Sequence, residues 1–173
     1  MTTSMSASSR LANQLINRII SIKVNETVNT IIKNKNMELL YQELAFLNLF
    51  VDSSGSMDLN MLRKKIASIC NKYSIKCIYI DYLQLLRGSG KTENRTLEVT
   101  EISRTLKNIA KDFEVPVVAL SQISRRVEER QNKRPQLADL RESGSIEQIV
   151  LLLYRDSYYK IGSNNELEIN VAK

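Results

Sequence analysis

The chain holds 173 residues with a mass of 19.8 kDa, which is the size of one ordinary domain. Hydrophobic residues make up 43% and charged residues 25%, so the composition is that of a folded globular protein and excludes collagen-like, mucin-like and wholly disordered chains. The 25 Lys and Arg residues outnumber the 19 Asp and Glu residues, and the resulting charge of +6 is compatible with a polyanionic partner without establishing one.

The first third of the chain is predicted to be mostly helical, because apolar residues recur at helical spacing over 6–21, 24–33 and 37–47. Residues 50–52 are predicted to form a short strand before a turn rich in Ser and Gly. A further helix then follows, since the next apolar residues lie on one helical face. They are Leu59, Leu62, Ile66, Ile69, Cys70 and Tyr73.

Two nearly continuous apolar runs, over 77–83 and 116–120, predict strands of a parallel sheet that are buried on both faces. Between them the pattern predicts a polar loop over 86–95 and a strong amphipathic helix that ends near Phe113. This order predicts right-handed βαβ units. The fold class is therefore α/β, with an open, mostly parallel sheet flanked by helices on both faces.

After the second apolar run the periodic pattern is lost. Residues 121–145 are rich in Arg and Lys and contain a proline that forbids a continuous helix, so they are predicted to be an exposed loop. The last two strands are predicted over 149–154 and 167–172, joined by a polar turn.

The sequence also bears on the compartment. Its longest apolar stretches are far shorter than the roughly 20 residues of a membrane-spanning helix. The first ten residues lack the apolar segment of a secretory signal, so we expect a protein that is not secreted. Because the chain has no His, Cys70 and Cys77 are expected to be buried thiols and not metal ligands.

Polar side chains follow both buried runs, where ligands bind in open parallel sheets. Asp81 ends the first run, and a carboxylate there can hold the Mg²⁺ ion of a nucleotide-hydrolysing site. An Asp that only caps a loop or helix is the alternative interpretation. Gln122 follows the second run and can sense a phosphate through hydrogen bonds, although an ordinary polar strand end is equally compatible with its position.

The segment 88–92 ends in the letters of a phosphate-binding P-loop. That motif needs a Gly five positions before Gly90, where this chain has Leu85. The segment also follows the strand that carries Asp81, whereas a phosphate loop and the acid that holds Mg²⁺ come from different strands. We therefore interpret 88–92 as a flexible loop.

A cluster of cations follows Gln122. Between positions 125 and 134, five basic residues oppose two acidic ones, a local excess of +3. Guanidinium groups on loops, together with the amides of small residues such as those after Arg141, suit the phosphates of a single-stranded nucleic acid. A solvated surface loop is the alternative, because no aromatic residue lies between these cations.

Several segments, in order, closely resemble the RecA-like motor domain of DnaB-type replicative DNA helicases. The resemblance covers nearly the whole chain, and its most specific part is the string Asp-Leu-Arg-Glu-Ser-Gly-Ser-Ile-Glu-Gln at 139–148. It implies a homo-hexameric ring that uses ATP and Mg²⁺ to translocate on single-stranded DNA and to unwind duplex DNA at the replication fork. Primase and a helicase loader are the further partners that it implies. The other matching segments are 80–86, 93–95, 101–107, 115–122 and 133–135.

The resemblance also implies roles for individual residues. Asp81 corresponds to the acid that holds Mg²⁺, Gln122 to the residue that couples nucleotide to DNA, and Lys173 to a lysine that reaches the γ-phosphate of a neighbouring subunit. The remaining assigned residues belong to loops that hold the DNA backbone. They are Arg125, Arg126, Arg130, Lys133, Arg134, Arg141, Glu142 and Gly144.

Some parts of the family's machinery have no counterpart in this sequence. They are the phosphate loop, the catalytic Glu, the arginine finger and an acidic stretch after Gln148. Ser4 stands at the position expected for the catalytic Glu. We therefore expect a single, partial RecA-like ATPase domain over 1–173, without the first P-loop strand. Its mostly helical part is 1–56, and its strands and loops lie in 57–173.

The isolated chain is expected to hydrolyse ATP poorly or not at all. A non-catalytic DNA- or helicase-binding remnant of the same family is the second hypothesis. A different RecA-like ATPase is a third, against which the string at 139–148 argues. Because Ile, Asn and Lys are abundant, as in AT-rich genomes, the expected location is a plastid stroma or a bacterial-type cytoplasm.

Overall fold

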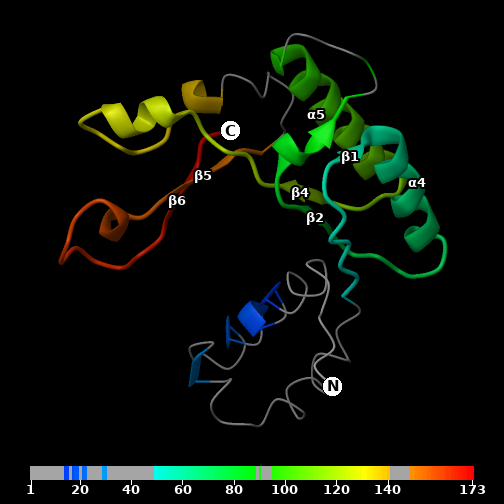
Figure 1. Cartoon of the computed structure of the whole chain (residues 1–173), viewed down its shortest axis with the longest axis horizontal. Coiled ribbons are helices and arrows are strands. Elements are labelled where there is room, and N and C mark those ends of the chain that lie inside the picture. Colours follow the sequence, from blue (N-terminus) through cyan, green and yellow to red (C-terminus); the bar gives the residue numbers. More distant parts are fainter. Residues whose placement is uncertain are drawn as a thin grey trace, which may run out of the picture. The chain divides into compact units, whose positions relative to one another are not determined.

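In the computed structural model (Figure 1), two compact units are formed by Met1–Gly55 and Ser56–Lys173. In the first unit the described residues 14–15, 17–19, 21–22 and 29–30 are helical, in keeping with the helices predicted over 6–21 and 24–33. The helix predicted over 37–47 lies outside the described residues, as does Ser4. The structure describes residues 14–15, 17–19, 21–22, 29–30, 49–88, 90, 95–140 and 149–173.

The strand predicted over 50–52 is wrong, since these residues have no regular structure. Phe50 and Val51 are 42% and 40% exposed. Among the described residues no strand pairs with this segment, and a strand needs a partner for its backbone hydrogen bonds. The prediction rested on the apolar residues Phe50 and Val51 alone, and these do not determine a strand.

The second unit begins with the short strand β1 (Met57–Asp58) and the helix α4 (Leu59–Cys70). Asp58 caps the helix, because its carboxylate accepts a hydrogen bond from the Met61 amide at 2.9 Å. The predicted helix is confirmed, with Leu59 and Ile66 buried. Tyr73 lies beyond the end of the helix and is 50% exposed, so its place on the apolar face was wrong.

The two apolar runs form the parallel strands β2 (Ile78–Ile80) and β4 (Val117–Ala119), which pair directly. The helix α5 (Arg95–Asp112) lies between them in sequence, as predicted. The expected polar loop before α5 is partly wrong, because β3 (Leu86–Arg87) pairs in parallel with β1 and Leu86 is buried. A strand of two residues is too short to show a period in the sequence.

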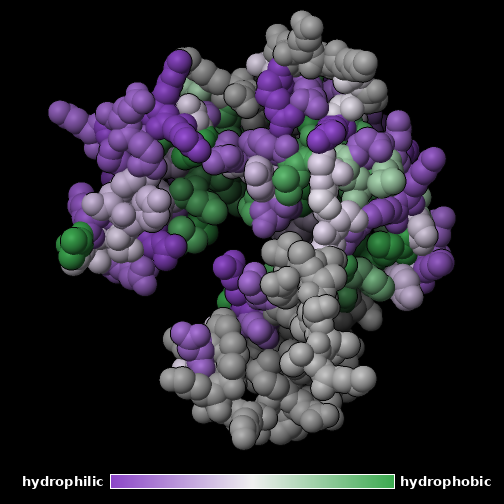
Figure 2. All heavy atoms as spheres, viewed as in Figure 1, coloured by the Kyte–Doolittle hydropathy of each residue, from purple (hydrophilic) through white to green (hydrophobic). Residues whose placement is uncertain are grey.

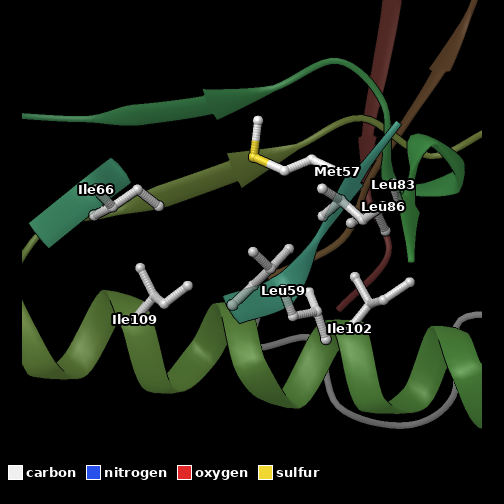
Figure 3. Close-up of a cluster of buried hydrophobic side chains, with 8 residues drawn as sticks. Met57, Leu59, Ile66, Leu83, Leu86, Ile102 and Ile109 are labelled. Carbon is white, nitrogen blue, oxygen red and sulfur yellow. The ribbon is translucent and has the colours of Figure 1, made fainter. Parts of the chain in front are cut away.

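One hydrophobic core joins α4, α5 and one face of the β2–β4 pair (Figure 3). Buried side chains of α5 point towards those of α4 and of the strands, and Ile102 and Ile109 are completely inaccessible to solvent. The inward-facing strand residues pack against the same cluster. They are Ile78, Ile80, Val117 and Ala119.

The prediction that the strands are covered on both faces is wrong for the described part of the chain. Tyr79 and Val118 are register partners on the other face of the β2–β4 pair, and they are 76% and 43% exposed. The helices α4 and α5 pack in the core cluster against the opposite face of this strand pair, which carries Ile78, Ile80, Val117 and Ala119. Residues that alternate along a strand point to opposite faces, so only one face of this pair is covered here.

The final part of the chain combines an irregular basic segment with an antiparallel hairpin. The 3₁₀ helices η2 (Arg125–Glu129) and η3 (Leu137–Leu140) give order to the segment that was predicted to be wholly loop. Strands β5 (Leu151–Tyr154) and β6 (Glu168–Val171) confirm the last two predicted strands. They flank the 3₁₀ helix η5 (Asp156–Tyr158).

The described strands thus form three sheets of two strands each, two parallel and one antiparallel. This agrees with an α/β fold of mostly parallel strands. Hydrophobic surface is visible over the β5–β6 hairpin (Figure 2), where Leu153 and its partner Ile169 are both more than half exposed. No helix in the described part of the chain is long and apolar enough to span a membrane.

Candidate functional site

The carboxyl ends of β2 and β4 bring the two predicted polar residues to one edge of the sheet. The amide of Leu120 donates to the carbonyl of Ile80 at 2.9 Å, and the amide of Leu83 donates to the carbonyl of Leu120 at 2.9 Å. Asp81 and Gln122 therefore lie in two chain segments that remain hydrogen-bonded beyond the strands. This places them as the sequence predicted.

Gln84 joins these two segments through its side chain, and sequence reasoning assigned it no role. Its amide nitrogen donates to Ser121 Oγ and to the Gln122 carbonyl, both at 3.3 Å, and its amide oxygen accepts from the Gln122 amide at 3.4 Å. Both backbone groups of Gln122 are thereby held by one residue. The Gln122 side chain is exposed and makes no hydrogen bond with any other described residue, so it is available to a ligand.

Asp81 is exposed, and its carboxylate has no hydrogen bond or ion pair with other residues of the described ranges. Mg²⁺ is commonly held by one or two carboxylates while waters and substrate phosphates complete its coordination. A single free carboxylate at the end of a strand fits such an ion as one protein ligand. The described residues contain no group of three or more acidic, His or Cys side chains that could hold a metal by themselves.

The segment that imitates a P-loop begins with an occupied amide. The Gly88 amide donates to Glu98 Oε1 at 3.0 Å, and Glu98 also pairs with Arg95. A Cβ atom at Gly88 would lie 2.6 Å from Glu101 Oε2, so the backbone at Gly88 packs tightly against α5. This use of the amide agrees with the interpretation that 88–92 is not a phosphate cradle, although Ser89, Lys91 and Thr92 lie outside the described residues.

A pocket of about 920 Å³ opens beside the end of β4. The side of the pocket near the strands is formed by Gln84 and Gln122, and the other side by the segment 123–140. Three of the predicted DNA-binding arginines line it, namely Arg125, Arg126 and Arg130. Asp81, Lys133, Arg134 and Lys173 are not among its lining residues.

The arginines of the pocket differ in their contacts. Arg125 and Arg126 are exposed, and their guanidinium groups have no partner among the residues that the structure describes. Arg130 instead donates to the carboxylate of Asp139 at 2.7 Å and to the Arg134 carbonyl at 3.1 Å. The side chain of Asp139 is only 9% exposed, so this ion pair is partly buried and holds Arg130 against the segment that contains η3.

Lys133 and Arg134 face the β5–β6 hairpin. Arg134 Nε bonds to both carboxylate oxygens of Glu168, at 3.0 and 3.1 Å, and its guanidinium lies 4.6 Å from the centre of the Tyr154 ring. Glu168 accordingly raises the pKa of Arg134, mainly by hydrogen bonding. Lys133 donates to the Glu128 carbonyl and lies 5.8 Å from the ring centre of Tyr159.

Lys173 ends the ladder of the hairpin, where its carbonyl accepts from the Val150 amide at 3.0 Å. Arg141, Glu142 and Gly144 lie outside the described residues, so their predicted contacts with DNA stay predictions. Cys70 and Cys77 are free and half-buried, so they are less buried than expected. Cys70 is the last residue of α4 and packs against the core, and Cys77 directly precedes β2.

Comparison with known proteins gives the same family throughout. A family model described as the DnaB-like helicase C-terminal domain matches residues 1–173. The replicative DNA helicase DnaB of Geobacillus stearothermophilus is 42% identical over 175 residues, which cover 94% of this chain and 38% of that protein. A probable replicative DNA helicase of Trieres chinensis is 44% identical over 139 residues, with 78% and 30% covered.

Two solved structures resemble this one with TM-scores of 0.81 and 32% identity. One of them, described as an ATPase domain, is matched over 94% of this chain and 63% of its own. The other, a DnaB-like replicative helicase described with its interactions with primase, is matched over 98% of this chain and 43% of its own. The chain thus spans less than two fifths of the curated relatives above. It belongs to the DnaB-like helicase family, within the C-terminal domain of that family.

Proposed function

We propose that this chain acts in a replicative DNA helicase motor, which unwinds duplex DNA by ATP-dependent translocation on single-stranded DNA. In the active form, six copies of the motor form a ring, and primase and a loader bind to it. ATP with Mg²⁺ is the cofactor, and Asp81 would hold the metal, which supplies positive charge to the transferred phosphate. The membership of the chain in the family supports each of these points.

One observation carries the part of this proposal that concerns the chain itself. Gln122 and two unpaired arginines line the same pocket, next to the sheet edge that holds Asp81. A group that contacts nucleotide and groups that contact DNA can affect one another directly when they lie close together. Arg125 and Arg126 would bind backbone phosphates of the single strand, because both are exposed and, in the described part of the chain, free of acidic partners.

This assignment narrows the set of DNA-binding cations predicted from sequence. Arg130 and Arg134 are bound to acids of the same chain, and Lys133 to a carbonyl, so we assign them first to holding the loop. Among the described cations of this loop, Arg125 and Arg126 can change partners without breaking an internal contact. The segment 141–148 would add its own contacts.

The test is the affinity of the full chain for a fluorescent oligothymidylate at several salt concentrations. Each phosphate contact on a single strand contributes roughly 0.7 to the slope of log affinity against log salt. The double variant Arg125→Ala with Arg126→Ala should therefore bind more weakly and with a slope smaller by about 1.4. Arg104→Ala removes an exposed arginine of α5 outside the pocket, and it serves as the matched control.

Equal binding by the wild type and the double variant would contradict the assignment. Binding that depends on the two arginines but not on added ATP would favour the second hypothesis, a non-catalytic DNA-binding remnant of this family.

A further inference from the structure

Three tyrosines at the turn of the β5–β6 hairpin pack on one another. The rings of Tyr154 and Tyr159 are stacked, with centroids 5.8 Å apart and an angle of 14° between their planes. Tyr158 meets Tyr159 edge to face at 5.0 Å. Tyr154 is 8% exposed, whereas Tyr158 is 75% exposed. In this tyrosine cluster the ring of Tyr154 is therefore buried and the ring of Tyr158 is open to solvent.

The tyrosine cluster lies directly against the basic loop, which comprises residues 125–134. Arg134 covers the Tyr154 ring, Lys133 lies over Tyr159, and the Tyr159 hydroxyl donates to the Glu128 carboxylate at 3.0 Å. These contacts join residues that are far apart in the sequence. The fold thus supplies the aromatic groups that the basic loop lacks in its own sequence.

We propose that Tyr158, supported by Tyr159, whose own ring lies under Lys133, is a stacking site for a nucleobase. Proteins that bind single strands without sequence preference combine cations with aromatic side chains, because every base has a π face that can stack. Tyr159 is held by two ring contacts and a hydrogen bond, so it gives Tyr158 a fixed support and little of its own freedom is lost when a base arrives. The site extends the proposed function and depends on it.

The charges around the tyrosine cluster permit a phosphate to approach. Asp156 accepts from the Tyr154 hydroxyl at 2.6 Å and from Lys160 at 3.3 Å, and Glu168 is bound to Arg134. Asp156 and Glu168 are therefore both bound to cations or hydrogen-bond donors of the same chain. Lys133 and Arg155 have no acidic partner within the described ranges, and Arg155 directly precedes η5. These two cations can meet the phosphate that accompanies a stacked base.

The base could come from single-stranded DNA or from a free nucleotide. The chain contains no tryptophan, so the variant Tyr158→Trp has a single indole as a reporter of stacking. Its fluorescence should be quenched when a base stacks on it, and the titrants are oligothymidylate in one arm and ATP in the other. Quenching by the oligonucleotide assigns the site to a polynucleotide, and quenching by ATP alone assigns it to a nucleotide. Quenching by neither overturns the inference.

The matched control is Tyr79→Trp, since Tyr79 is 76% exposed on the uncovered face of β2 and has no ring partner in the described residues. Its fluorescence should not respond. In binding assays Tyr158→Ala should weaken the affinity for whichever titrant quenches by about fivefold or more, the usual effect of losing one stacked base. Tyr158→Phe should restore it, because the ring and not the hydroxyl makes the contact.

The two proposals can fail separately. If Arg125 and Arg126 prove necessary for DNA binding while Tyr158→Ala binds like the wild type, the stacking site is wrong and the proposed function stands. If the wild-type chain binds neither oligothymidylate nor ATP, both proposals fall.

Discussion

At the scale of single residues, Glu98 links a loop to the start of a helix. Its carboxylate accepts from the Gly88 amide and pairs with Arg95 in the first turn of α5. The hydrogen bond from Gly88, followed by the one from Arg95, lowers the pKa of the Glu98 carboxyl below its ordinary value of 4.5. The folded chain therefore favours the charged form of this group.

This shift predicts how stability depends on pH. Because the pKa of Glu98 is lower in the folded chain than in the unfolded chain, its contribution is complete above the ordinary value and is lost as the pH falls through the folded one. Glu98→Gln should lower Tm at neutral pH, and the difference from the wild type should shrink as the pH falls below the ordinary value of 4.5. Thermal unfolding followed by circular dichroism measures this. A difference that stays constant over that range would contradict the role of the charge.

The sequence predicted the strand-end residues better than the residues that support them. Asp81 and Gln122 could be found because each follows an apolar run and parallel strands end at the same edge. Gln84 could not, since its side chain bonds to Ser121 at a separation of 37 residues, and nothing in the local pattern marks it. Hydrogen bonds between distant segments leave no periodic signal in a single sequence.

At the scale of elements, α5 was the clearest prediction. Its apolar face repeats over several turns, and the structure buries Val99, Ile102 and Ile109 almost completely. Elements whose identity depends on partners were harder to predict. β3 is a strand only because β1 lies beside it, and the segment 125–134 is ordered by acids and tyrosines that come from elsewhere in the chain.

The core role of α5 can be tested within the one helix. Ile109 is completely buried, so Ile109→Ala should lower the free energy of unfolding by roughly 2–5 kcal/mol through lost burial and the cavity that remains. Leu97 is 58% exposed on the same helix, and Leu97→Ala should change stability by about 0.5 kcal/mol or less. Urea denaturation of both variants provides the measurement. Equal effects would show that the buried face has been wrongly assigned.

At the scale of the whole molecule, apolar side chains on uncovered strand faces stand out. Leu151 and Val171 are register partners on β5 and β6, and both are more than half exposed. Leu152 and Tyr154, which alternate with the exposed residues of β5, are buried, so β5 carries apolar side chains on both faces. In β6 the partners of these two residues are the polar Asn170 and Glu168. For the runs that form β2 and β4, the sequence predicted burial on both faces, whereas only one face is covered in the described part of the chain.

Catalysis is also a property of the whole molecule. Asp81 has no partner in the described part of the chain, but the described amide at the start of the segment 88–92 is occupied by Glu98. We expect the purified 173-residue chain to release little or no phosphate from ATP, with or without single-stranded DNA. Hydrolysis that DNA stimulates and that Asp81→Ala abolishes would contradict this expectation. A phosphate-release assay on both proteins decides it.

The last pair of backbone hydrogen bonds in the β5–β6 hairpin, which we call its last rung, links two segments to which separate contacts were assigned. The Val150 amide and carbonyl bond to the backbones of Lys173 and Ala172, at 3.0 and 2.9 Å. Val150 follows Arg141, Glu142 and Gly144 in the chain, for which the resemblance implies contact with DNA. Lys173 is the residue for which it implies contact across a subunit boundary. Because these two backbone hydrogen bonds join the chain on both sides of the rung, we expect a displacement of Val150 to shift Lys173 as well.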